Sequence, residues 1–82
     1  MDGLNLYLIE PFEGVKMTGY DRMTRAVVAA ALVQEARKVA AKGAGNEGAG
    51  VWLDGLKTKV RKISDTSIYK TARIVCADHV NG

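Results

Sequence analysis

The sequence predicts an α+β domain in which four strands form a mainly antiparallel sheet with one helix on one face, in the order β-β-α-β-β. Three observations lead to this fold class. Residues 4–10, 56–63 and 71–77 have the length and the alternating or apolar pattern of strands. Residues 31–42 carry apolar side chains at helical spacing. With 82 residues, the chain is expected to form a single domain over residues 1–82.

The first strand is expected at residues 4–10, LNLYLIE. Its leucines occupy alternate positions and therefore share one face, because side chains alternate along a strand. Pro11 ends this strand, since proline has no N–H to donate to a neighbour. Turn-forming residues at Glu13-Gly14 and Thr18-Gly19 predict a loop before the second strand.

The segment 22–42 contains no glycine or proline, and its pattern changes partway. Val27 and Val28 are β-branched and favour a strand at 23–29. The helix is expected at 31–42, with one apolar face formed by Leu32, Val33, Ala36, Val39 and Ala40. Its polar face would consist of Gln34, Glu35, Arg37, Lys38 and Lys42. The alanines favour helix, so a single helix over 22–42 remains the alternative.

Residues 29–33 offer no Ser, Thr, Asp or Asn to cap the helix, so its start should be soft. Gly43 is a conventional helix stop. It opens a glycine-rich stretch, residues 43–50, that we predict to be a flexible loop. A phosphate-binding loop would precede a helix and continue into Lys-Ser or Lys-Thr, and this one does not. Trp52 is expected to fill the core beside the helix, with an exposed interface role as the alternative.

Two further strands are expected, at residues 56–63 and 71–77, and the second is apolar on both faces. A sheet edge of that kind favours pairing with a second copy, so we expect a homodimer. Packing the helix on one face of the sheet would bury a common set of side chains. This predicted core consists of Leu6, Val28, Leu32, Ala36, Val39, Val60 and Ile74.

Composition narrows the class of protein. The chain has one cysteine and therefore no internal disulfide, which fits a reducing compartment. It has no apolar run long enough to cross a membrane, and its first residues lack the basic start of a secretory signal. We therefore expect a soluble, intracellular protein.

The sequence offers little for catalysis or metal binding. Cys76, Asp78 and His79 are the one group of reactive side chains, and they lie near the end of the chain. A nucleophilic pair would need an orienting third group and an oxyanion pocket. A metal site would need a second cluster of ligands. Cys76 is more simply a small apolar side chain, and we expect no enzyme, no cofactor and no metal.

The basic residues are the most informative feature. Residues 57–73 carry six cations against one acidic residue, whereas the net charge of the whole chain is only +3. The six candidate partner-binding residues are Lys57, Lys59, Arg61, Lys62, Lys70 and Arg73. Lysines on a strand also serve simply to solvate a face and to prevent edge pairing. As a binding surface, they would contact an acidic protein face or, weakly, the phosphates of nucleic acid, with Tyr69 as a stacking aromatic.

The chain as a whole resembles a group of very short proteins encoded by phages and prophages. The resemblance spans nearly the full length and is carried by short motifs. They are Leu6–Ile9, Tyr20-Asp21, Ala26–Ala30, Glu35–Arg37, the aromatic Trp52 and the closing segment Ile74–Gly82. This sequence departs from the pattern at the helix start, where Ala31–Gln34 stands in place of the usual Ser or Asn with Glu residues.

This resemblance implies a phage or prophage accessory protein that works by binding in the cytoplasm of the bacterial host. Some similar proteins of this size are anti-CRISPR proteins, which bind a bacterial CRISPR effector complex of the Cascade type and block DNA recognition or nuclease recruitment. We therefore expect inhibition of such a complex, and no functional residue transfers from the family. A small basic nucleic-acid-binding protein and a virion structural or assembly protein remain the alternatives.

Overall fold

The computed structural model describes residues 3–15, 21–45 and 47–81. In chain order these form β1 (Asn5–Pro11), β2 (Asp21–Ala30), α1 (Val33–Lys42), α2 (Ala49–Leu53), β3 (Thr58–Ser64) and β4 (Arg73–Asn81). Some residues named above lie outside the described part: Thr18-Gly19 of the predicted loop, Tyr20 and Gly82 of the family motifs, and Asn46 within the glycine-rich stretch.

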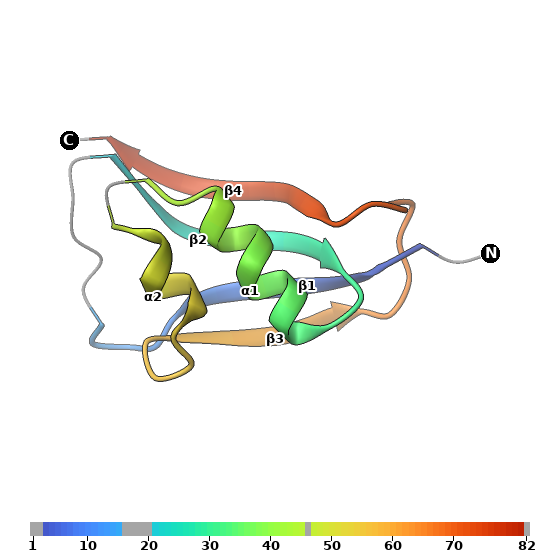
Figure 1. Cartoon of the computed structure of the whole chain (residues 1–82), viewed down its shortest axis with the longest axis horizontal. Helices are drawn as coiled ribbons and strands as arrows, with labels where there is room; N and C mark the ends of the chain where they lie inside the picture. Colours follow the sequence, from blue (N-terminus) through green and yellow to red (C-terminus); the bar gives the residue numbers. More distant parts are fainter. Residues whose placement is uncertain (1–2, 16–20, 46, 82) are drawn as a thin grey trace.

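The four strands form one antiparallel sheet in the order β3-β1-β2-β4. Both helices lie over the same face of this sheet (Figure 1). β1 and β2 are therefore central, while β3 and β4 are the two edges. The predicted α+β class is confirmed, and α2 is an additional helix that the sequence did not predict.

The segment before the helix is a strand, as predicted, and the single helix over 22–42 is excluded. β2 runs through the centre of the sheet and pairs with β1 on one side and β4 on the other. Val27 lies opposite Leu8 of β1, and Val28 lies opposite Tyr7. The β-branched pair thus packs within a pleated sheet, the environment that such side chains favour. The alanines of β2 do not override this preference because the central position supplies two neighbouring strands.

Small side chains fill the contact between the helix and the sheet. Ala26 and Ala30 of β2 and Ala36 and Ala40 of α1 are almost fully buried in one cluster. Because alanine side chains end at Cβ, they let the helix backbone approach the sheet closely at ordinary packing density. Val39, Val60 and Ile74 of the predicted core pack against this cluster, and Ala36 and Val28 belong to it.

The face of β1 that meets the helix was predicted wrongly. Tyr7 and Ile9 are the buried side chains, so Leu6 lies on the opposite, helix-free face of the sheet together with Leu8. Asn5, on the helix side, looks unsuitable for a core position. Its Nδ2 donates hydrogen bonds to Tyr7 Oη and to the Ala31 carbonyl oxygen, both at 3.2 Å. A polar side chain satisfied in this way can sit at the edge of a core at little cost.

Leu32 is a second correction to the predicted core, because its side chain is 62% exposed. It occupies the N-cap position of α1 with extended backbone angles, so it precedes the first helical turn. No side chain caps the helix from this position, as predicted. Glu35 compensates in part for the missing cap, because its Oε1 accepts a hydrogen bond from the Ala31 N–H at 2.7 Å. In a capping box the N3 glutamate bonds to the N–H of the N-cap residue itself, so this bond reaches one residue further back.

Glu47, within the glycine-rich stretch 43–50, is buried and joins three parts of the chain. Its Oε1 accepts hydrogen bonds from the backbone N–H groups of Met23 (3.1 Å) and Gly45 (2.9 Å). Its Oε2 accepts a hydrogen bond from Trp52 Nε1 at 2.6 Å. The stretch was predicted to be a flexible loop throughout, but its last two residues form the first turn of α2. Trp52 is fully buried, which confirms its predicted core role and excludes the exposed one.

Arg37 was assigned to the solvent face of the helix, but it holds α1 to the segment that leads into β3. Its Nη1 donates hydrogen bonds to Thr58 Oγ1 (2.8 Å) and the Trp52 carbonyl oxygen (3.2 Å). Its Nη2 donates to the Thr58 carbonyl oxygen at 2.9 Å. Thr58 is itself fully buried. A planar guanidinium suits this arrangement because its fixed donors reach several acceptors at once.

A matched pair of glycine substitutions tests the backbone at the start of α2. Gly48 has a φ of 89° and Gly50 does not have a positive φ, while an added Cβ would meet nothing within 4 Å at either position. Gly48→Ala is therefore expected to lower the free energy of unfolding by about 1–2 kcal/mol, through backbone strain alone. Gly50→Ala should be neutral or stabilising by up to about 1 kcal/mol. Urea unfolding followed by circular dichroism measures the free energy of unfolding of both variants. Equal values would contradict the positive φ of Gly48.

Candidate interaction surface

The fold separates the six candidate partner-binding residues into two groups. Lys57 lies in the turn before β3, and Lys59, Arg61 and Lys62 lie within β3. Lys70 lies in the connection after β3, and Arg73 opens β4. Because β3 and β4 are opposite edges of the sheet, the six do not form one surface. We call the first four residues the basic edge.

Side chains of the basic edge point to both sides of the sheet. Lys59 is opposite Glu10 and Arg61 is opposite Leu8, which places both cations on the helix-free face. Lys62 is opposite Tyr7 and therefore belongs to the helix side. All of these cations are exposed, and among the described strands β3 has a neighbour on one side only.

The charge of the basic edge is only slightly neutralised within the chain. Lys59 Nζ lies 3.8 Å from Glu10 Oε1, in an ion pair whose side chains are 53% and 29% exposed. Such a pair contributes little to stability because water screens it. Lys59 Nζ also lies 6.0 Å from the centre of the Phe12 ring, at the limit of a cation–π contact. The basic edge therefore remains a positively charged surface.

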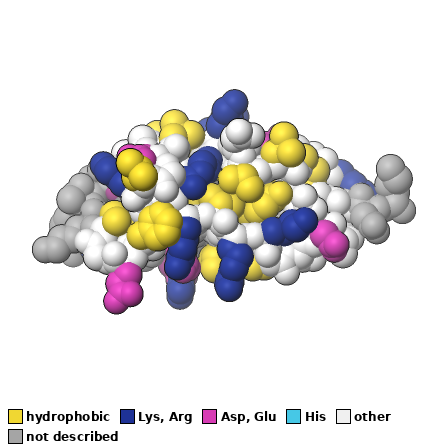
Figure 2. Space-filling model, turned by 90° about the horizontal axis from the view of Figure 1, so that it is seen from below, with side chains coloured by type: hydrophobic (Ala, Val, Ile, Leu, Met, Phe, Trp, Pro, Cys, Tyr) yellow, Lys and Arg dark blue, Asp and Glu magenta, His cyan; other side chains and the backbone are white. Residues whose placement is uncertain are grey.

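Exposed apolar side chains adjoin both ends of the basic edge, with Ile63 (46% exposed) after Lys62. At the Lys57 end are three more, which we call the apolar trio: Phe12 (41% exposed), Leu53 (51%) and Leu56 (88%). The Phe12 N–H donates a hydrogen bond to the Lys57 carbonyl oxygen at 3.0 Å, which fixes the end of β1 beside the turn that carries Leu56. Figure 2 views the molecule from the side on which β3 lies in Figure 1. It shows Lys and Arg side chains projecting from this side with hydrophobic side chains between them.

The sequence pattern does not predict the apolar trio, because it places Leu56 at the start of the strand expected at 56–63. In the structure Asp54 Oδ1 accepts a hydrogen bond from the Leu56 N–H at 2.8 Å, which closes a turn and turns the leucine outward. The Asp54-Gly55 pair was the available signal, because an aspartate of this kind commonly caps a turn two residues on.

Lys70 and Arg73 belong to a different part of the surface. The guanidinium of Arg73 lies 5.5 Å from the centre of the Tyr69 ring, and the Tyr69 carbonyl oxygen accepts a hydrogen bond from the Leu4 N–H at 2.7 Å. Tyr69 is half-buried and has Arg73 over its ring. A base would have to displace this arginine in order to stack on that face of the tyrosine.

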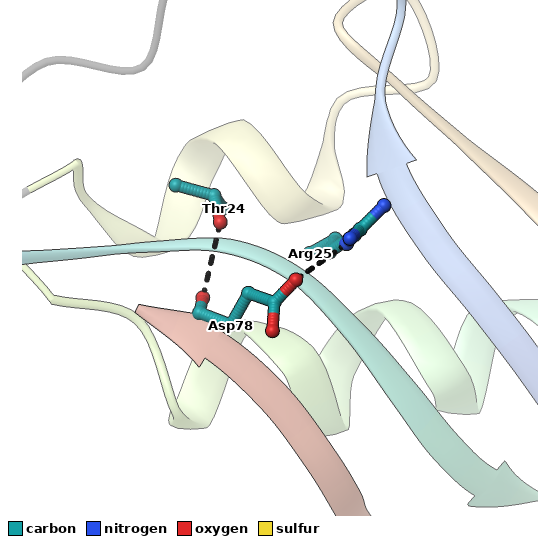
Figure 3. Close-up of polar contacts among 3 residues, drawn as sticks. All are labelled: Thr24, Arg25 and Asp78. Atoms are coloured by element: carbon teal, nitrogen blue, oxygen red, sulfur yellow. Dashed lines mark hydrogen bonds and ion pairs between the residues drawn. The ribbon is translucent and has the colours of Figure 1, made fainter. Parts of the chain in front are cut away.

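Cys76, Asp78 and His79 do not converge on one site. Asp78 is engaged in an ion pair with Arg25, with Asp78 Oδ2 at 2.6 Å from Arg25 Nε (Figure 3). This hydrogen bond and the charge of Asp78 raise the pKa of Arg25 above its ordinary value. Cys76 lies opposite Val27 on the helix-free face, whereas His79 lies opposite the core residue Met23. In the described part of the chain, no three His, Cys, Asp or Glu side chains gather as they would around a metal ion.

The hollows on the helix-free face are shallow. One lies over Leu8, Val27 and Cys76 and has a volume of about 110 Å³. A second lies over Leu8, Lys59 and Arg61 and has a volume of about 170 Å³. A third lies over Glu10, Arg25 and Asp78 and has a volume of about 340 Å³, but it is open to solvent. Pockets for small organic ligands usually measure about 300–1,000 Å³ and enclose most of the ligand. None of these three open hollows encloses a small molecule in that way.

The comparisons with known proteins identify no family for the chain. Neither a protein-family model, nor a curated protein, nor a solved structure matches the chain. Among the described residues, no helix has the length and apolar character needed to cross a membrane.

The homodimer expected from the apolar last strand stays a prediction. β4 does lie at a sheet edge, as that prediction requires, and Val75 forms an irregularity in its pairing with β2. Irregularities of this kind bend an edge and weaken its pairing with another strand. Pairing through β4 should give a dimer mass in light scattering at high micromolar concentration. A monomer mass under those conditions would end the proposal.

Proposed function

We propose that this chain is a non-catalytic binding protein that docks its basic edge, with the adjoining apolar trio, on an acidic surface of a partner protein. The observation that carries this proposal is an exposed edge in which the cations of β3 continue into the turn of Lys57 and Leu56, with Phe12 fixed beside that turn. Apolar side chains at the centre of a contact supply affinity, and complementary charge supplies orientation and association rate.

A protein partner suits this surface better than nucleic acid does. Binding to duplex DNA would depend on phosphate contacts, each adding about 0.9 to the slope of affinity against salt. A surface with few cations would then bind weakly at physiological salt. Single-strand binding needs aromatic rings open for stacking. Here Arg73 lies over one face of the Tyr69 ring and Lys59 lies near the Phe12 ring, so a stacked base would compete with these cations.

The particular function that we propose is that of a phage or prophage accessory protein. It would inhibit a bacterial CRISPR effector complex of the Cascade type in the cytoplasm of the host. The support is the resemblance of the short motifs to small phage proteins, together with a fold that presents charged and apolar side chains on an exposed edge. A nucleic-acid-binding protein and a virion assembly protein are the competing proposals.

An interference assay tests the proposed inhibition. Bacteria with an active CRISPR system are transformed with a targeted plasmid, with and without expression of this chain. Transformation should rise to the level of an untargeted plasmid when the chain is present. In parallel, the purified protein is titrated with an arbitrary DNA duplex. Unchanged interference together with tight, salt-sensitive DNA binding would overturn the proposal in favour of nucleic-acid binding.

A further inference from the structure

The outer side of β3 carries free backbone hydrogen-bonding groups. β3 pairs with β1 alone among the described strands. The Phe12 N–H bonds to the Lys57 carbonyl oxygen, so the backbone groups of Lys57 point toward β1. In an antiparallel pair the direction alternates with each residue. Lys59 and Arg61 therefore also point their backbone groups toward β1, while Val60 and Lys62 point theirs away from the sheet.

The charges of the β3 side chains determine which kind of strand can pair with the outer edge of β3. A second copy of β3 would bring Lys59, Arg61 and Lys62 against the same cations, and like charges placed opposite each other are destabilising. An acidic segment would instead place carboxylates beside them. The pairing of β3 with β1 is regular from Thr58 to Lys62 and shifts only beyond that point, so the edge is straight over these residues. Long regular edges are the ones that accept an added strand.

We propose that β3 accepts an extended acidic segment of the partner protein as a fifth strand of the sheet. This inference rests on the proposed function and specifies how the basic edge binds. The added strand takes hydrogen bonds from the outward N–H groups of Val60 and Lys62 and donates to their carbonyl oxygens. Its acidic side chains on the helix-free face lie beside Lys59 and Arg61, and those on the helix side lie beside Lys62. In strand addition, main-chain hydrogen bonds supply the affinity, and the side chains at alternate positions supply the selectivity.

The test uses isotope-labelled full-length protein and a short synthetic peptide of alternating Glu and Thr with blocked ends. Titration should shift the amide signals of Val60 and Lys62 downfield, because these N–H groups gain acceptors. Two matched peptides serve as controls: one with Lys in place of Glu, and one with the acidic sequence and every backbone nitrogen methylated. Neither should produce these shifts. The first peptide has the wrong charge, and the methyl groups of the second remove its donors and hold its carbonyl oxygens too far from β3 to accept hydrogen bonds.

A pair of protein variants provides a second measurement. Lys62→Ala and Lys62→Pro both remove the charge, but only Lys62→Pro removes the outward N–H, and an edge strand tolerates proline where its N–H faces solvent. Lys62→Pro should bind the acidic peptide about fivefold more weakly than Lys62→Ala, as expected for the loss of one backbone hydrogen bond. Equal binding of the methylated and unmethylated acidic peptides would overturn strand addition while leaving charge-driven docking intact. Absence of any response of β3 to the acidic peptide would count against both.

Discussion

Trp52→Ala is expected to leave most of the protein unfolded under conditions in which the natural chain is folded. Trp52 is fully buried between α1, α2 and the sheet, and its indole N–H is bonded to Glu47. Truncating a buried tryptophan costs about 3–5 kcal/mol. A carboxylate left short of a donor adds about 1–3 kcal/mol. A domain of this length has a total stability of only about 4–12 kcal/mol, so these losses remove most of it.

The experiment compares Trp52→Ala with Trp52→Phe and Leu56→Ala. The phenylalanine variant keeps an aromatic ring in the core and removes the indole N–H, so it should lose less stability than the alanine variant. Leu56 comes from the same segment and is 88% exposed, so its truncation should change stability by less than about 0.5 kcal/mol. Unfolding is followed by far-ultraviolet circular dichroism, because Trp52 is the only tryptophan and its fluorescence is lost on substitution. A cooperative transition for Trp52→Ala close to that of the natural chain would contradict this account of the core.

The buried position of Glu47, the hydrogen-bond partner of Trp52, could not be predicted from the sequence. The residues 43–50 are mostly glycine and alanine, a composition that indicates a loop without fixed contacts. Nothing in that pattern says that Glu47 turns inward, since its three donors come from β2, the loop itself and α2. α2 was missed for a related reason. Its five residues, AGVWL, include a glycine and a β-branched valine, and so short a segment has no helical period to detect.

The placement of the strands could be predicted, but the side of β1 that faces the helix could not. In LNLYLIE both faces carry apolar side chains, so alternation alone does not select one. The leucines seemed the better core residues because Asn5 shares a face with Tyr7 and Ile9. The hydrogen bonds of Asn5 to Tyr7 and Ala31 remove that objection, and Ala31 comes close only after the chain has folded. A pattern within one strand cannot contain this information.

The cations of the candidate surface were visible in the sequence, but their grouping depended on the strand order. Lys62 and Arg73 lie in consecutive strands of the chain, which would usually be neighbours in an antiparallel sheet. In the order β3-β1-β2-β4 these strands are separated by the full width of the sheet. The basic edge is therefore a smaller surface than the charge count of residues 57–73 indicated, and the apolar trio becomes a substantial part of it.

Reversing two charges of the basic edge, by Lys57→Glu with Arg61→Glu, is expected to abolish binding to an acidic partner and to restore CRISPR interference. Both side chains are exposed, so the domain itself should remain folded. Each substitution removes an attraction and introduces a repulsion, and close like charges cost several kcal/mol across an interface. Every ~1.4 kcal/mol weakens affinity tenfold, so the double variant should show no inhibition. Lys59 is left unchanged because its contact with Glu10 would confuse the result.

The matched control is Lys38→Glu with Lys42→Glu, which changes the net charge by the same amount. Both lysines are exposed on α1, on the face of the domain that carries the helices. If binding depends on the basic edge, this control should inhibit interference as the natural chain does, whereas the variant in the basic edge should not. The two double variants are first compared by circular dichroism to establish that both are folded. Equal loss of inhibition in both would show that overall positive charge matters rather than this surface, and full inhibition by the Lys57/Arg61 variant would exclude the basic edge as the contact.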